Sequence, residues 1–214
     1  RWKESDHATE IIIEGGKIKK VQDAASALGT TIEVRQLFFN TPARRKFLKS
    51  TRSEELKVKS WVMHASIARP QVRFRLFSDS REILNIPRHD SLSMRGAYFF
   101  RGTTVAIEQQ QGQIVVRGNV AHPGLAQMDS ASFVILVNGR LVSDRLVLRA
   151  VKDGFDSTLK EREFPVGFVH IELSPADVDV NVHPQKSEVR FRHPQEVFEA
   201  VKSAVLRGVR DFRF

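Results

Sequence analysis

The stretch from Gly29 to Lys49 constrains the fold of this chain more than any other. Apolar and polar residues alternate between Thr31 and Phe39, and this alternation predicts a strand. Asn40 or Thr41 can cap a helix, and Pro42 suits the first helical position, where a missing N–H costs nothing. The turns that follow carry four basic side chains, those of Arg44, Arg45, Lys46 and Lys49. We therefore predict a strand followed by a basic helix whose free N–H groups could receive a phosphate, although a solvated basic face fits the same residues.

The composition is typical of a soluble globular protein. Apolar residues make up 41% of the 214 positions and charged residues 28%. The absence of cysteine excludes disulfides and thiolate metal sites, and it fits a reducing compartment. No apolar run approaches the roughly 18 residues of a membrane-spanning helix, and the seven histidines show no metal-ligand spacing. We expect neither a membrane segment nor a bound metal, and the opening Arg1, in place of an initiator methionine, indicates a piece of a longer protein.

The net charge of +9 is concentrated in one segment. Between Arg44 and Arg75, ten lysines and arginines stand against only Glu54 and Glu55. From Arg81 onward the two signs nearly balance. Such localised charge is typical of proteins that bind a polyanion, whereas a basic surface that only serves solubility is the alternative.

Hydrophobic periodicity and turn residues predict an α+β fold in which strands are interleaved with long helices. We expect strands over 10–13, 17–21, 72–76, 82–86, 105–108, 114–117, 133–137, 166–173, 178–182 and 189–191. We expect helices over 53–68, 91–100, 145–155 and 194–209. The nearly all-apolar strand 133–137 should be buried on both faces, and the tight-turn signal Asn138-Gly139 should direct Arg140 out of its end. The sheet should be covered mainly on one face, and a boundary near Pro87 should divide the chain into domains 1–87 and 88–214.

Three stretches, in order and with matching spacing, resemble the MutL family of DNA mismatch repair proteins. The first is Gly29-Thr30-Thr31, followed by Leu-Phe-Phe-Asn-Thr-Pro-Ala-Arg-Arg-Lys-Phe-Leu over 37–48. The others are Val137-Asn138-Gly139-Arg140 and the run from Asp179 to Phe191. The resemblance covers the chain from about Gly29 to its end and is far more specific than any short glycine motif.

The resemblance implies a fold and a function. Residues 1–87 would be the C-terminal part of a GHKL-type ATPase α/β sandwich, and residues 88–214 a transducer domain of the ribosomal-protein-type βαβ fold. In MutL proteins ATP and Mg²⁺ close a dimeric clamp on DNA, which couples a MutS-type mismatch sensor to a downstream nuclease and helicase. The resemblance further implies homodimerisation through regions outside this chain and a bacterial cytoplasmic, nucleoid-associated location.

The resemblance also implies site residues. Lys186 matches the catalytic lysine that reaches the γ-phosphate of ATP, and a compact ammonium with three donors suits a terminal phosphate, although a solvated surface lysine fits the pattern as well. Thr30 matches a position that helps to hold the adenine. The residues that match DNA-binding positions are Lys46, Lys49, Arg140 and Arg145, and Lys46 and Lys49 should share one helical face.

The chain also departs from the family pattern. It contains no Asn-Glu-x-x-Asp-Ala and no Asp-x-Gly-x-Gly, so the Mg²⁺-binding asparagine, the general-base glutamate and the adenine-binding aspartate of the family are missing. We therefore expect this chain alone neither to bind nor to hydrolyse ATP. A ribosomal-type nucleic-acid-binding module without a nucleotide switch is the main alternative. A topoisomerase subunit of the same ATPase superfamily is a third, and the Asn-Thr-Pro-Ala-Arg-Arg-Lys motif argues against it.

Overall fold

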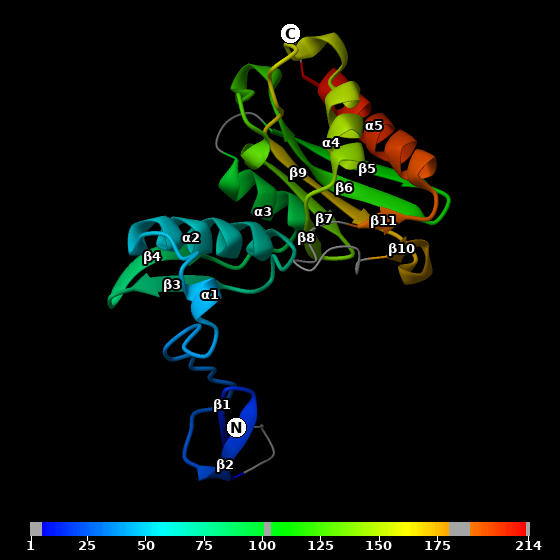
Figure 1. The fold of residues 1–214 in the computed structure, drawn as a ribbon. Helices are drawn as coiled ribbons and strands as arrows, with labels where there is room; N and C mark the ends of the chain where they lie inside the picture. Colours follow the sequence, from blue (N-terminus) through cyan, green and yellow to red (C-terminus); the bar gives the residue numbers. More distant parts are fainter. Residues whose placement is uncertain (1–5, 101–103, 180–188, 213–214) are drawn as a thin grey trace. The chain divides into compact units, whose positions relative to one another are not determined.

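The computed structural model describes residues 6–100, 104–179 and 189–212, which form two compact units, Arg1–Glu54 and Glu55–Phe214 (Figure 1). The first unit begins with a hairpin of β1 (Ala8–Glu14) and β2 (Lys17–Ala24). Gly15 and Gly16 form its turn with φ angles of 57° and 82°, which glycine adopts without strain. The hairpin predicted from the sequence is confirmed, and its isoleucines are largely exposed.

The strand predicted over 31–39 is wrong, because the structure assigns no strand to residues 25–41. Ile32 and Val34 are 83% and 71% exposed, and the side chains of Glu33 and Arg35 pair with each other at 2.7 Å. A strand is stabilised by a neighbour that accepts and donates its backbone hydrogen bonds, and none of the described residues supplies one here. The alternation of residues is present in the sequence, but alternation alone does not form a strand.

The basic helix is shorter than predicted. α1 (Pro42–Arg45) has Thr41 at its N-cap and proline at its first position, as predicted, but the Thr41 side chain makes no capping hydrogen bond. Lys46 is already the C-cap residue, and Lys49 lies beyond the helix, so the predicted shared helical face is wrong. No residue of α1 is buried, and a helix without a packed face gains too little to extend beyond its costly first turn.

The second unit begins with a helix and a hairpin. α2 (Thr51–Ile67) runs across the boundary between the units and ends before Arg69-Pro70, as predicted. β3 (Phe74–Ser78) and β4 (Arg81–Ile86) form the predicted hairpin, and the Ser78 hydroxyl donates to the Glu55 carboxylate of α2. α3 (Leu92–Phe99) follows, and the Ser91 hydroxyl caps it by accepting from the Met94 N–H at 3.2 Å.

A five-stranded sheet forms the centre of the second unit. Its strands lie in the order β5-β6-β9-β7-β8, and all neighbours are antiparallel except β7 and β9. The strands are β5 (Thr104–Gln111), β6 (Ile114–Ala121), β7 (Phe133–Val137), β8 (Arg140–Val142) and β9 (Gly167–Glu172). All five residues of β7 are buried, as predicted.

Helices cover both faces of this sheet. α4 (Arg145–Gly154) and α5 (Pro194–Arg210) lie side by side and enclose the larger core with one face (Figure 1). On the other face, Phe168 and Leu136 pack with Ile67 from the end of α2 and with residues of α3. The expectation of a sheet covered mainly on one face is therefore corrected, because the apolar residues of α2 and α3 bury the second face. The predicted α+β class is confirmed.

Short elements complete the described chain. They are η1 (Pro123–Leu125), η2 (Ser130–Ser132), η3 (Asp156–Thr158), η4 (Pro175–Asp177), β10 (Val178–Asp179) and β11 (Arg190–Phe191). β10 and β11 pair antiparallel, and Lys186 lies between them, outside the described residues. No helix in the described ranges is long and apolar enough to cross a membrane.

Candidate nucleic-acid interface

Arg140 is presented by a tight turn at the edge of the sheet. Asn138 and Gly139 connect β7 to β8 with φ angles of 48° and 76°, the left-handed pair that a two-residue hairpin turn requires. Val137 pairs with Arg140 directly across this turn. The Arg140 side chain is exposed and forms no ion pair with another described residue.

The turn is held in place by hydrogen bonds to the end of β9. The Asn138 side-chain amide donates to the Leu173 carbonyl and accepts from the Leu173 N–H, each at 3.0 Å. The Asn138 backbone N–H donates to the Ile171 carbonyl at 2.9 Å. Because a side chain here imitates a strand backbone, the parallel pairing of β7 with β9 extends one residue into the turn.

His170 holds the next residue of the turn. The Gly139 N–H donates to His170 Nε2 at 3.0 Å, so Nε2 carries no proton. Burial lowers the pKa of His170, and the nearby Arg117 and Arg69 lower it further, whereas Glu172 opposes them. The imidazole is therefore neutral at neutral pH, which preserves its hydrogen bond to the turn.

The neutral state of His170 predicts a pH dependence of stability. Because the folded-state pKa of His170 is below the ordinary value of 6.5, its contribution is fully present above that value and is lost as the pH falls towards the folded-state pKa. We expect the free energy of unfolding, measured by urea denaturation, to fall between about pH 7 and pH 5. His170→Gln should show a smaller fall, because glutamine does not titrate.

Other histidines also contribute to the measured pH dependence. Burial also lowers the pKa of His64, which therefore contributes in the same direction. Only the difference between the His170→Gln variant and the unmodified chain reports on the turn. An identical pH dependence of the two proteins would contradict a role for His170 titration.

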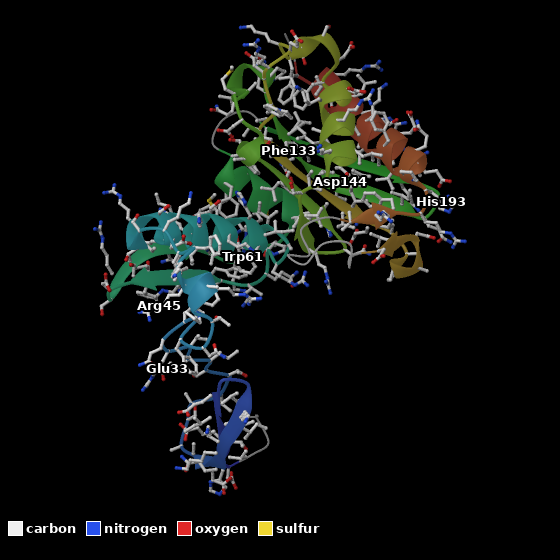
Figure 2. The ribbon with its side chains drawn as sticks, in the orientation of Figure 1. Glu33, Arg45, Trp61, Phe133, Asp144 and His193 are labelled. Carbon is white, nitrogen blue, oxygen red and sulfur yellow. The ribbon has the colours of Figure 1, made fainter. Side chains whose placement is uncertain are left out.

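Arg145 lies at the start of the helix that follows β8. The Asp144 carboxylate, labelled in Figure 2, caps α4 by accepting from the Val147 N–H at 2.9 Å. Arg145 is exposed at the first helical position, next to the positive end of the helix dipole. A cation there does not stabilise the helix, whereas an anion bound beside it would be favoured by both charges.

The other predicted site residues lie in the first unit or outside the described residues. Thr30, Lys46 and Lys49 are exposed in the segment that contains α1, and the Lys49 backbone N–H donates to the Glu54 carboxylate at 3.0 Å. Arg140 at the start of β8 and Arg145 at the start of α4 are therefore five positions apart in the sequence. Lys46 and Lys49 are at and just beyond the C-terminal end of α1. Lys186 is outside the described residues.

A pocket of about 330 Å³ in the second unit contains none of the predicted site residues. Its lining includes Met63 and Ile67 of α2 and Phe99 of α3. Across the part of the chain that the structure describes, no three His, Asp or Glu side chains are grouped so that they could hold a metal ion.

Comparisons with known proteins identify the family. Residues 94–209 match the family model described as "DNA mismatch repair protein, C-terminal domain". The chain is 36% identical over 208 residues to the DNA mismatch repair protein MutL of Pelobacter propionicus, and 39% identical over 210 residues to that of Citrifermentans bemidjiense. Each alignment covers 96% of this chain but only 34% and 32% of the relative, so the chain spans about a third of the length of these curated relatives.

The fold agrees with this result. The Aquifex aeolicus MutL ATPase domain, solved in complex with ADP, is 25% identical and aligns with a TM-score of 0.65 over 95% of this chain and 70% of that one. The predicted fold, a part of a GHKL-type ATPase region followed by further α+β structure, is confirmed by this likeness. The chain belongs to the MutL family of DNA mismatch repair proteins.

Proposed function

We propose that this chain is the part of an ATP-gated dimeric DNA clamp that carries the nucleotide-sensing lysine and a DNA-binding groove. The observation that supports this proposal best is the ordered turn at Asn138-Gly139, which is fixed by four hydrogen bonds to the end of β9 yet presents an exposed arginine without an ion-pair partner among the described residues. A rigid turn that holds an exposed arginine without an ion-pair partner among the described residues is well suited to bind an anionic ligand. The phosphate backbone of DNA is the ligand that agrees with the family.

The proposed DNA contacts do not read the base sequence. Arg140 and Arg145 in the second unit, with Lys46 and Lys49 in the first, would bind backbone phosphates, and such contacts position a protein on DNA without specifying sequence. The transducer domain would begin near residue 88 and contain both arginines. In the longer protein these contacts would be made while a MutS-type sensor and a downstream nuclease and helicase are engaged.

The proposed switch depends on Lys186 and ATP. A lysine that contacts only the γ-phosphate forms an interaction with ATP that ADP cannot offer, so hydrolysis would release it. Thr30 would help to hold the adenine, and Mg²⁺ and the general base would come from a MutL-type ATPase segment that this sequence does not contain. The Aquifex aeolicus ATPase domain was solved in complex with ADP, which supports nucleotide binding in the longer protein.

The DNA-binding part of the proposal is tested by Arg140→Glu. We expect about tenfold weaker binding of duplex DNA at low salt and a much smaller effect at high salt, because one charge-assisted contact contributes about 1.5–3 kcal/mol and salt weakens it. Fluorescence anisotropy of a labelled duplex between about 50 and 200 mM salt measures both values. An equal loss at both concentrations would show that Arg140 acts on the structure of the turn instead.

The same measurement separates the clamp from a ribosomal-type module. A clamp should bind duplex DNA in a nucleotide-dependent way when this chain follows a MutL-type ATPase segment. A ribosomal-type module should bind structured RNA more tightly than DNA and should not respond to a non-hydrolysable ATP analogue. The second result would overturn the proposal.

A further inference from the structure

A second arginine lies against the turn that presents Arg140. An ideal Cβ built on Gly139 would lie 3.0 Å from Arg69 Nη1, 3.6 Å from Nη2 and 3.7 Å from Cζ. The Arg69 guanidinium therefore packs against the side of Gly139 where another residue would carry its side chain. Arg69 and Gly139 are 70 positions apart in the sequence, at the end of α2 and between β7 and β8. Glycine serves two needs here, since its φ of 76° suits the turn and its missing side chain admits the guanidinium.

The backbone that carries Arg69 is also held firmly. The Arg69 N–H donates to the Ser66 carbonyl, and the Arg69 carbonyl accepts from the Val72 N–H, both at 3.1 Å. Arg95 of α3 is fully buried, and its Nη2 donates to the carbonyls of Arg69 at 3.4 Å, Val72 at 2.8 Å and Pro70. Hydrogen bonds therefore hold the backbone on which both Arg69 and Arg140 lie.

The arginines around the turn differ in whether a carboxylate balances their charge. Arg117, which pairs with His170 across β6 and β9, binds the carboxylates of Glu108 at 2.9 Å and Glu172 at 2.5 Å. In contrast, neither Arg69 nor Arg140 forms an ion pair with any residue in the described ranges, and the only acceptor found there for the Arg69 guanidinium is the Ala68 carbonyl, at 2.9 Å. Arg140 shares the sheet face of its partner Val137, whereas Arg69 follows α2 on the other face, so the two arginines lie on either side of the edge turn at Gly139. An anion bound along this edge would meet two cations whose charge no described carboxylate balances.

We propose that Arg69 is a second phosphate-binding residue, which acts with Arg140 on the backbone of duplex DNA. This inference rests on the proposed function and adds a residue to its binding surface. Guanidinium groups suit the task, because their planar donors can bind two phosphate oxygens at once. His170 and Arg95 are positioning residues, since the first holds Gly139 and the second holds the segment that carries Arg69.

The test compares four variants of the full chain by the slope of log K against log salt concentration. Each phosphate contact contributes roughly 0.9 to this slope for duplex DNA. We expect Arg69→Gln and Arg140→Gln each to lower the slope by roughly 0.9, and the double variant to lower it by roughly twice as much. Arg69→Lys should keep the slope of the unmodified chain, because it keeps the charge.

Arg207→Gln is the matched control, since it removes the same charge from an exposed position on α5. α5 contacts β5 and β6 at one edge of the sheet, whereas Arg140 lies on β8 at the other edge. Its slope should stay close to that of the unmodified chain. Circular dichroism melts of all variants check that the exposed substitutions leave the fold intact.

The outcomes separate this inference from the proposed function. A lower slope for Arg140→Gln but not for Arg69→Gln would overturn the role of Arg69 and leave the clamp proposal standing. Unchanged slopes for both would overturn the DNA-binding part of the proposed function itself. A second arm titrates sodium tripolyphosphate, and loss of its binding in Arg69→Gln without a change in the DNA slope would assign Arg69 to a free phosphate group rather than to DNA, which also overturns the inference.

Discussion

Lys186→Ala is expected to lower the rate of ATP hydrolysis by about 10²–10³-fold in a protein in which this chain follows a complete MutL-type ATPase segment. The reason is that an ammonium on the γ-phosphate stabilises charge that develops as the phosphoryl group is transferred, and removal of one such donor costs about 2.7–4 kcal/mol in the transition state. Steady-state phosphate release, measured with and without duplex DNA, gives the effect. The DNA-stimulated rate of ATP hydrolysis should fall together with the basal rate.

A lysine elsewhere in the chain controls for the loss of charge. Lys160 is 87% exposed at its side chain and pairs with Glu163 at 3.7 Å, so Lys160→Ala removes the same charge from a position that we connect with neither nucleotide nor DNA. This variant should hydrolyse ATP at the unmodified rate. Full turnover by Lys186→Ala would remove the nucleotide-sensing role from this lysine, and turnover by the isolated chain would refute its expected inactivity.

Arg95→Ala is expected to lower the free energy of unfolding by about 3 kcal/mol, a larger loss of stability than we expect from any of the substitutions at exposed positions. The Arg95 side chain is fully buried, so its truncation leaves a cavity. It also leaves the carbonyls of Pro70 and Val72 without the donor that they have now, and a buried unpaired acceptor costs about 1–3 kcal/mol. Urea denaturation followed by circular dichroism measures the loss.

Two further variants separate the causes. Arg95→Met keeps most of the buried stem but loses the donors, so it should be destabilised by about 2 kcal/mol, between the alanine variant and the unmodified chain. Arg88→Ala removes an exposed arginine seven positions earlier and should stay within about 0.5 kcal/mol of the unmodified chain. If Arg95→Met were as stable as the unmodified chain, the bonds to the α2 end would contribute nothing, because burial of the charge, which lowers the pKa of Arg95, would offset them.

Local signals in the sequence predict most elements of the second unit. Helix α3 begins after the Ser91 cap, α2 ends at Arg69-Pro70, and β7 is a buried apolar run, all of which depend on residues close in sequence. The strand predicted over 31–39 is wrong because a strand also depends on a partner, and a partner is not a local property. The fold therefore follows from the sequence where short-range chemistry decides it.

The sequence predicts the turn motif of the candidate site, but it does not predict the residues that hold this turn in place. Asn138-Gly139 indicates the turn and the exposure of Arg140. The bonds from His170 and Leu173 come from residues more than 30 positions later, and no spacing rule connects them to the turn. In the sequence, Arg69 together with Pro70 only indicates where a helix ends. Its contact with Gly139 depends on how α2 packs against β7, which the sequence does not predict.

The placement of the core leaves one part of the chain open to proteolysis. Almost every buried apolar side chain belongs to residues 55–214, and Ala8 is the exception among the described residues. The basic stretch at Arg44-Arg45-Lys46 is exposed and contains three trypsin sites in a row. We expect limited trypsin digestion to cut the chain there first. The cut would separate Thr30 from the sheet that carries Arg140, so the candidate nucleotide-binding and DNA-binding residues could be studied in separate fragments.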